Sequence, residues 1–195
     1  HLHDRDPGGN AQLRDIAAAF EPIRLDDACT AGIHAAAQTV QGIVAAGQPA
    51  YGINTGFGKL AKVHVPADQL EQLQTNLVRS HAAGVGALLD DTTVRMILAL
   101  KIASLARGYS GVRMQVIDTL LAMYNAELWP CIPCQGSVGA SGDLAPLAHW
   151  ALAAMGEGKL RCRGEIRVAA EFRCRAGISP LRLAAKEGLA LLNGT

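Results

Sequence analysis

Three small residues, Ala140, Ser141 and Gly142, stand directly before a pattern typical of a helix start. Because Gly142 has no side chain, its backbone nitrogen can approach the Ala140 carbonyl closely, in a conformation that other residues disfavour. Ring closure between them would release one water, and elimination of the Ser141 hydroxyl would release a second. The product is a methylidene-imidazolone, a strong electrophile that standard side chains do not provide. The alternative is an ordinary turn leading into a helix.

The wider stretch from Gly136 to His149 resembles the signature of the aromatic amino acid ammonia-lyases, and most closely that of the histidine ammonia-lyase branch. Three further stretches, in matching order and spacing, resemble the same family: Tyr51–Gly58, Leu77–Gly84 and Ala184–Thr195. The resemblance covers the chain from about Gln12 onward. It implies a helical fold of the fumarase/aspartase-like superfamily and the non-oxidative deamination of L-histidine to urocanate and ammonia.

The resemblance assigns roles to the small residues and to a tyrosine. Ala140, Ser141 and Gly142 would cyclise autocatalytically to the 4-methylidene-imidazol-5-one (MIO) prosthetic group, with no external cofactor, and Asp143 could support ring formation. Either the amino group or the imidazole of the substrate would add to this electrophile. Tyr51 would be the catalytic acid/base, carried on a loop that covers the site. From its composition alone, the glycine-rich segment around Tyr51 predicts only a tight loop with a packed ring.

His81 and Asn193 each have an ordinary interpretation and a functional one. The helix expected to open at Asp68 has His81 on its apolar face, where a core histidine with one hydrogen bond is the ordinary case. However, the Ser80-His81 pair resembles the histidine-specific lyases, in which this histidine contacts the substrate imidazole. Asn193, followed by Gly194, is typical of a helix C-cap. The resemblance instead implies that its side chain hydrogen-bonds the prosthetic group and the substrate.

Helices are the main elements that must position these residues, so the fold class is predicted to be mainly α. A small β-hairpin is expected near 160–168, an irregular lead-in at 1–10 and a loop at 130–142. The whole of 1–195 is interpreted as one N-terminal catalytic domain. Apolar spacing with caps and stops predicts helices at 11–20, 26–47, 68–81, 90–107, 112–128, 143–155 and 179–192.

Composition and charge limit the other classes of function. The chain has 195 residues, 50% of them hydrophobic, and a formal net charge of +1, which favours a soluble protein with one core over a nucleic-acid or membrane protein. No apolar run reaches membrane-spanning length and the N-terminus lacks the regions of a secretory signal, so a cytoplasmic location is expected. The arginines between 161 and 175 predict a solvated basic face.

The cysteines offer a competing chemistry. Their odd number, 5, argues against a disulfide framework. Cys131-Ile-Pro-Cys134 has a spacing that can hold zinc or carry redox chemistry, but a second such pair or a nearby histidine pair is missing. Incidental thiols are therefore the favoured interpretation, and no metal is predicted. The resemblance gives these cysteines no role.

The length of the chain leaves two hypotheses open. Family members continue well beyond the position of Thr195 into a helical bundle that forms the core of a homotetramer and supplies further active-site residues. The chain could be the catalytic region of such an enzyme, acting on L-histidine once its partners are present. It could instead be an inactive fragment or binding module. Within the enzyme hypothesis, a related aromatic amino acid lyase or aminomutase is the alternative, and Ser80-His81 argues against it.

Overall fold

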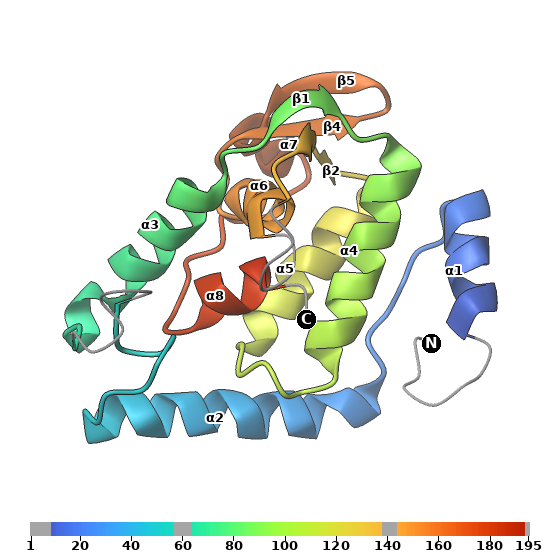
Figure 1. Ribbon diagram of the computed structural model, residues 1–195. Coiled ribbons are helices and arrows are strands. Elements are labelled where there is room, and N and C mark those ends of the chain that lie inside the picture. Colours follow the sequence, from blue (N-terminus) through green and yellow to red (C-terminus); the bar gives the residue numbers. More distant parts are fainter. Residues whose placement is uncertain (1–8, 57–63, 138–143, 194–195) are drawn as a thin grey trace.

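The computed structural model describes residues 9–56, 64–137 and 144–193, and within 9–13 only the backbone (Figure 1). Helices dominate these ranges, which confirms the expected fold class. Short 3-10 turns, η1 (Asp27–Cys29) and η3 (Ala67–Gln69), precede two of the helices. The α-helices are α1 (Gly9–Ala18), α2 (Thr30–Ala46), α3 (Leu70–His81), α4 (Asp91–Ala106), α5 (Met114–Asn125), α6 (Leu144–Ala154), α7 (Ala169–Arg175) and α8 (Glu187–Leu192).

Several helix ends follow from local chemistry that the sequence predicts. The Asp90 carboxylate accepts a hydrogen bond from the Thr93 backbone N–H at 2.8 Å and so caps α4. Asp26 caps the turn η1 in the same way, through the Ala28 N–H. Gly47 ends α2 with a left-handed φ of 66°, which a residue without a side chain adopts at little cost.

The core lies where α4, α5, α6 and α8 pack together, with α3 and α1 on either flank and α2 lying across one end (Figure 1). One continuous cluster of buried apolar side chains runs from α1 to α8. Trp150 on α6 is its largest fully buried member, and Leu98, Leu120 and Leu160 are buried around it. Burial of this apolar area is the main force that holds the helices in place.

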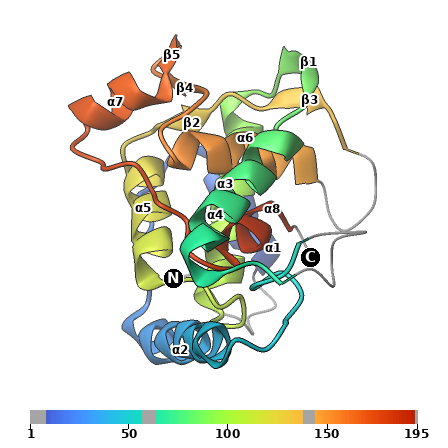
Figure 2. The same cartoon turned by 90° about the vertical axis from the view of Figure 1, so that its left-hand side faces the viewer.

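Short antiparallel strands cover the end of the molecule opposite α2 (Figure 2). The predicted hairpin is present as β4 (Lys159–Cys162) and β5 (Glu165–Val168), and β2 (Trp129–Pro130) extends it on the other side of β4. A separate pair joins β1 (Val85–Leu88) to β3 (Pro133–Gln135). Sequence analysis missed β1, β2 and β3 because each is at most 4 residues long, without clear alternation.

Two expectations about the chain ends are wrong. Helix α1 begins at Gly9, inside the expected irregular lead-in. The last helix begins at Glu187 rather than near 179, because Lys186 has a left-handed φ of 69° and the Glu187 carboxylate is drawn to the start of α5. There it accepts hydrogen bonds from the Arg113 side chain and backbone, with Arg113 Nε at 2.8 Å. This buried ion pair holds the segment before α8 against α5.

The predicted solvated basic face is wrong for two of its arginines. Arg173, on the unpredicted helix α7, is buried and donates to the carbonyls of Ala153 and Ala154 at the end of α6 and to that of Ser179. Arg161 is largely buried between the Asp91 carboxylate and a backbone carbonyl. Both guanidinium groups therefore satisfy backbone and carboxylate oxygens inside the fold.

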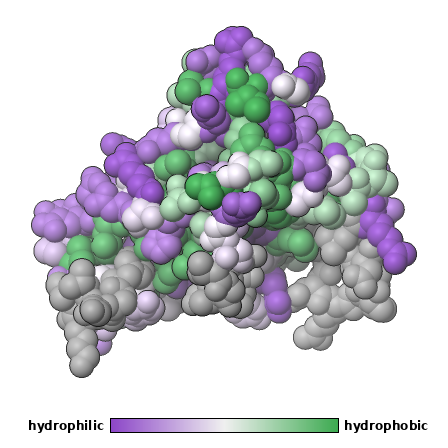
Figure 3. All heavy atoms as spheres, turned by 45° about the horizontal axis from the view of Figure 1, so that its top comes forward, coloured by the Kyte–Doolittle hydropathy of each residue, from purple (hydrophilic) through white to green (hydrophobic). Residues whose placement is uncertain are grey.

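The surface over the strands mixes hydrophilic and apolar side chains (Figure 3). Val85, Leu88, Ile166 and Val168 are the large exposed apolar residues of β1 and β5. Among the described helices, none is both long enough and apolar enough to cross a bilayer.

Candidate active site

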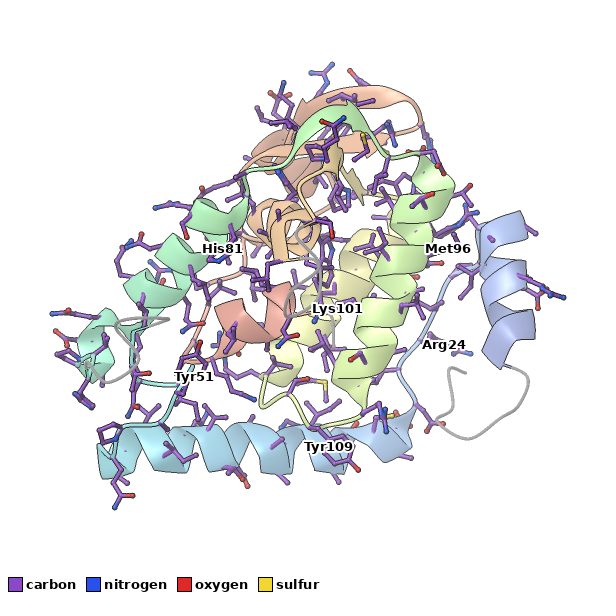
Figure 4. All side chains as sticks on the ribbon, viewed as in Figure 1. Arg24, Tyr51, His81, Met96, Lys101 and Tyr109 are labelled. Carbon is purple, nitrogen blue, oxygen red and sulfur yellow. The ribbon has the colours of Figure 1, made fainter. Side chains whose placement is uncertain are left out.

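The predicted site residues that the structure describes are Tyr51, His81 and Asn193, which come from three different segments. Figure 4 labels Tyr51 in the turn after α2 and His81 at the end of α3. Asn193 directly follows α8. Ala140, Ser141, Gly142 and Asp143 lie outside the described residues. The geometry of the site is therefore the geometry of the segments that carry the first three residues and flank the last four.

The turn that carries Tyr51 is anchored from within by Asn54. Its buried side chain accepts the Ala50 N–H at 2.7 Å and donates to the Gln48 carbonyl at 2.9 Å. The Tyr51 side chain itself is 61% exposed. A buried amide with partners on both of its atoms rigidifies the backbone around it, so the turn presents an accessible phenol from a fixed base.

Gly52 presses the same turn against α8. It has a left-handed φ of 76°, and a Cβ built there would lie 2.4 Å from Leu189 Cδ2. A larger residue would have to adopt a strained conformation and displace the end of the Leu189 side chain. Tyr51 is therefore held beside the helix that ends at Asn193.

His81 is fixed at the end of α3 by its own helix. Its Nδ1 lies 2.8 Å from the Leu77 carbonyl oxygen and 3.1 Å from Ser80 Oγ. Because a carbonyl oxygen only accepts, Nδ1 carries the proton, and in the neutral ring Nε2 is left as an acceptor. Such a nitrogen can accept a hydrogen bond from an N–H donor on a substrate ring.

Gln74 joins the helix of His81 to α8. This buried side chain accepts the Leu189 N–H through Oε1 at 3.2 Å. Gly188 packs directly on it, since a Cβ there would lie 2.8 Å from Gln74 Oε1. The close approach of α3 and α8 brings the helices of His81 and Asn193 together.

Lys101 on α4 fixes the exit of α8, and sequence analysis missed it. Its side chain is 7% exposed, and its Nζ donates to the carbonyls of Ala190 at 2.6 Å and Asn193 at 2.5 Å (Figure 4). Burial lowers the Lys101 pKa to about 8. A lysine inside the apolar run 96–103 of α4 is the sequence signal that could have revealed it.

A hollow of about 400 Å³ opens beside this contact. Lys101, Lys186 and Asn193 line it together with residues of the α4–α5 connection. Lys186 donates to the Ser110 carbonyl at 2.6 Å, and burial lowers its pKa. Asn193 therefore lies at the wall of a space large enough for a small molecule, in a positively charged setting.

The flanks of the undescribed segment 138–143 suit the predicted prosthetic group. Helix α6 begins at Leu144, directly after that segment in sequence, and its N-terminus is the positive end of an 11-residue helix. On the other side, Gly136 packs tightly, since a Cβ there would lie 3.1 Å from Gly84 Cα and 3.2 Å from Ala145 Cβ. A group that gains negative charge in the segment would be stabilised by the helix N-terminus.

The cysteine pair spans the connection between the two small sheets, with Cys131 directly after β2 and Cys134 on β3. Cys131 is half-buried and Cys134 is exposed, and both thiols are free. Burial raises the pKa of the Cys131 thiol, which disfavours the reactive thiolate. Within the ranges that the structure covers, no group of three or more histidine, cysteine or acidic residues is arranged to hold a metal ion.

Comparison with known proteins gives consistent results. The family model "Aromatic amino acid lyase" matches residues 10–195. A histidine ammonia-lyase of Pseudomonas fluorescens is 57% identical over 95% of this chain, which covers 36% of that relative. The crystal structure of histidine ammonia-lyase from Trypanosoma cruzi has a TM-score of 0.86 at 41% identity, over 94% of this chain and 36% of that one. The structure of the phenylalanine aminomutase of Pantoea agglomerans has a TM-score of 0.87 at 39% identity, over 94% of this chain and 36% of that one.

Proposed function

Because this chain belongs to the aromatic amino acid lyase family, we propose that it forms the N-terminal catalytic region of an enzyme that deaminates L-histidine to urocanate and ammonia. The chain spans about a third of the length of the curated relatives it matches, 36% for the one from Pseudomonas fluorescens. The activity is therefore proposed for the assembled enzyme, with residues 1–195 as one of its domains.

The observation that carries the proposal is that all the described site segments converge on α8. Gly52 beside Tyr51 packs on Leu189, Gln74 from the His81 helix bonds the same residue, and Lys101 bonds Asn193. One short helix thus sets the relative positions of a phenol, an imidazole and an amide. Precise relative placement of such groups is what catalysis requires.

In the proposed chemistry each described side chain has a distinct task. Nε2 of His81 accepts a hydrogen bond from the substrate imidazole and so selects histidine. Tyr51 moves the proton at the substrate β-carbon as the acid/base group. Asn193, at the wall of the hollow, orients the substrate toward the segment at the start of α6.

Residues 140–143 complete the proposal. Ala140, Ser141 and Gly142 form the MIO group and Asp143 supports ring formation. When formed, this group supplies an electrophilic carbon that no standard side chain offers. The helix N-terminus at Leu144 stabilises negative charge beside it.

An alternative substrate is favoured by the similarity to aminomutases that are named for tyrosine and for phenylalanine. The 57% identity to a histidine ammonia-lyase and the acceptor nitrogen of His81 favour histidine. A homotetramer and a cytoplasmic location belong to the same proposal, as does the absence of a metal, a nucleic acid or a membrane partner. An inactive fragment or binding module is the hypothesis that the test must exclude.

The test is a chimera in which this chain replaces the matched N-terminal portion of the Pseudomonas fluorescens enzyme. Ammonia release is measured with L-histidine, L-tyrosine and L-phenylalanine. The proposal expects activity with L-histidine above the other two, and loss of that preference in His81→Leu. A chimera that folds but releases ammonia from none of them would support the inactive module instead.

A further inference from the structure

Gly84 is the meeting point of three segments that surround the proposed site. It follows α3 and its terminal His81, and it lies against Gly136, which precedes the undescribed segment 138–143. On the third side stands His149 of α6, whose Nε2 accepts the Gly84 N–H at 2.9 Å. The contact therefore links the His81 end of α3 to the helix that begins directly after residues 140–143.

The fit around Gly84 is tight on every side. A Cβ built there would lie 3.0 Å from His149 Nε2, 3.3 Å from His149 Cδ2 and 3.2 Å from the Gln135 carbonyl oxygen. The backbone of Gly84 lies outside the left-handed region, so it is the neighbours and not the conformation that favour glycine here. A small change at this junction would therefore shift one segment relative to the others.

The hydrogen bond also defines the state of the imidazole. Since a backbone N–H only donates, Nε2 of His149 must be unprotonated, and the ring is neutral with its proton on Nδ1. Burial lowers the His149 pKa, which favours this neutral form. The chemistry proposed above gives this side chain no task, although it is a polar group built into the helix beside the site.

The apolar packing of α6 does not need a histidine at this position. The helix is held in the core by Leu147, Trp150 and its buried alanines. His149 instead makes a directional bond to the backbone of another segment. Such bonds fix position more than they add net stability.

We propose that His149 is a positioning residue, which through Gly84 sets the position of the His81 end of α3 relative to the start of α6. This inference rests on the proposed function, because it concerns the placement of the substrate-selecting ring relative to the group that reacts. A shift of about 1 Å between reacting groups lowers rates by up to roughly a hundredfold. Loss of the contact should therefore act on L-histidine turnover while the ring still forms.

The experiment compares His149→Gln with His149→Leu in the chimera. The glutamine Oε1 can accept the Gly84 N–H, whereas leucine fills a similar volume without an acceptor. We expect His149→Leu to raise KM for L-histidine and lower kcat/KM about tenfold or more, and His149→Gln to recover most of that loss. The intact mass of both variants should remain two waters below that of the unmodified sequence. Equal kinetics for the two variants would overturn the proposal.

A double-variant cycle tests the same contact from the glycine side. Gly84→Ala adds a methyl group against the His149 ring, so it should impair kcat/KM on its own. In Gly84→Ala/His149→Ala the ring is gone and only the contact of the new methyl group with the Gln135 carbonyl remains, so the double variant should lose less than the product of the two single losses. Simple multiplication of the two losses would contradict the inference.

A spectroscopic arm separates this inference from the proposed function. In the ¹⁵N-labelled 195-residue chain, the His81 ring nitrogen resonances should shift in His149→Leu and remain in place in His149→Gln. Unchanged His81 resonances in both variants would contradict the positioning role of His149, whatever the activity of the chimera. An inactive parent chimera would contradict the proposed function. The His81 resonances would then be the measurement that tests the role of His149.

Discussion

The buried ammonium of Lys101 donates a hydrogen bond to the backbone carbonyl of Asn193 at 2.5 Å, and a second one to Ala190. A cation at the last carbonyls of a helix also interacts favourably with its dipole. Through this contact the long helix α4 fixes the point at which the chain leaves α8. The contact therefore fixes the backbone position of Asn193.

Lys101→Met should lower activity without lowering stability. Its pKa of about 8 lies below the usual 10.5, so the buried cation costs about 3 kcal/mol of folding free energy at neutral pH. In the chimera we expect kcat/KM for L-histidine to fall roughly ten- to a hundredfold. Urea unfolding of the chain at pH 7 should show no loss of stability.

The pH dependence of the same variant provides a second check. The folded pKa lies below the unfolded one, so the stability of the original chain should rise as the pH rises from about 8 toward 10.5. Lys101→Met should lack this part of the rise. Lys159→Met, which removes an exposed lysine on β4, is the matched control and should keep it. Parallel pH curves for all three chains would argue against a buried cation.

Gly52→Ala should destabilise the turn that carries Tyr51. The new methyl group would lie 2.4 Å from Leu189 Cδ2, and the alanine would have to keep the left-handed φ of the glycine. Gly47→Ala is the matched control, because its φ of 66° is similar but nothing lies within 4 Å. We expect a loss of about 1 kcal/mol in the control and about 2–4 kcal/mol in Gly52→Ala, measured by urea unfolding. Adding Leu189→Ala should remove part of the excess, and equal losses at both glycines would contradict the contact.

Glu187→Gln tests the ion pair that precedes α8. The Glu187 side chain is 1% exposed and bonds Arg113 through both oxygens, with distances of 2.8 Å to Nε and to one terminal nitrogen. Neutralising one partner leaves a partly buried guanidinium with weaker compensation, which should cost about 3 kcal/mol. Glu71→Gln, at an exposed pair with Arg182, should cost at most about 0.5 kcal/mol. Similar losses in the two variants would mean that burial does not decide the effect.

The His149 contact should make the chain sensitive to mild acid. Burial lowers the His149 pKa below 6.5, so the unfolded chain takes up a proton more readily than the folded one. Stability should therefore fall as the pH falls below about 6.5 toward the folded pKa. His149→Gln should flatten this part of the curve, while His34→Gln, at an exposed position on α2, should not. Denaturation between pH 7 and pH 5 measures both.

Local signals predicted most of the helices and their ends. Asp90 caps α4 through its side chain, and Gly47 ends α2 through its left-handed backbone. Both effects depend only on nearby residues. The hairpin around Arg163-Gly164 is equally local. Helix α8, by contrast, is short because Glu187 bonds Arg113, which lies 74 residues away in sequence. No local pattern contains such a contact.

The candidate site residues come from motif resemblance, whereas the contacts that support them come from the structure. Motif resemblance pointed to Tyr51, His81 and Asn193, but not to the contacts that hold them. Lys101 and Gln74 act across the fold through backbone carbonyl and amide groups, which leave no periodic pattern. The charge pattern predicts Arg173 at the surface, because no local pattern reveals that backbone carbonyls inside the fold accept its hydrogen bonds. Long-range satisfaction of polar groups is what the fold adds to the sequence.

Ala140, Ser141 and Gly142 are proposed to become an electrophile in this chain, and the intact mass of the protein reveals whether they do. The chimera with the Pseudomonas fluorescens enzyme is measured beside its Ser141→Ala version and beside the parent enzyme. We expect the mass of the chimera to be two waters below the mass calculated from its sequence, and the Ser141→Ala version to have its full calculated mass. A folded chimera at full mass, beside a parent enzyme that has lost two waters, would contradict it.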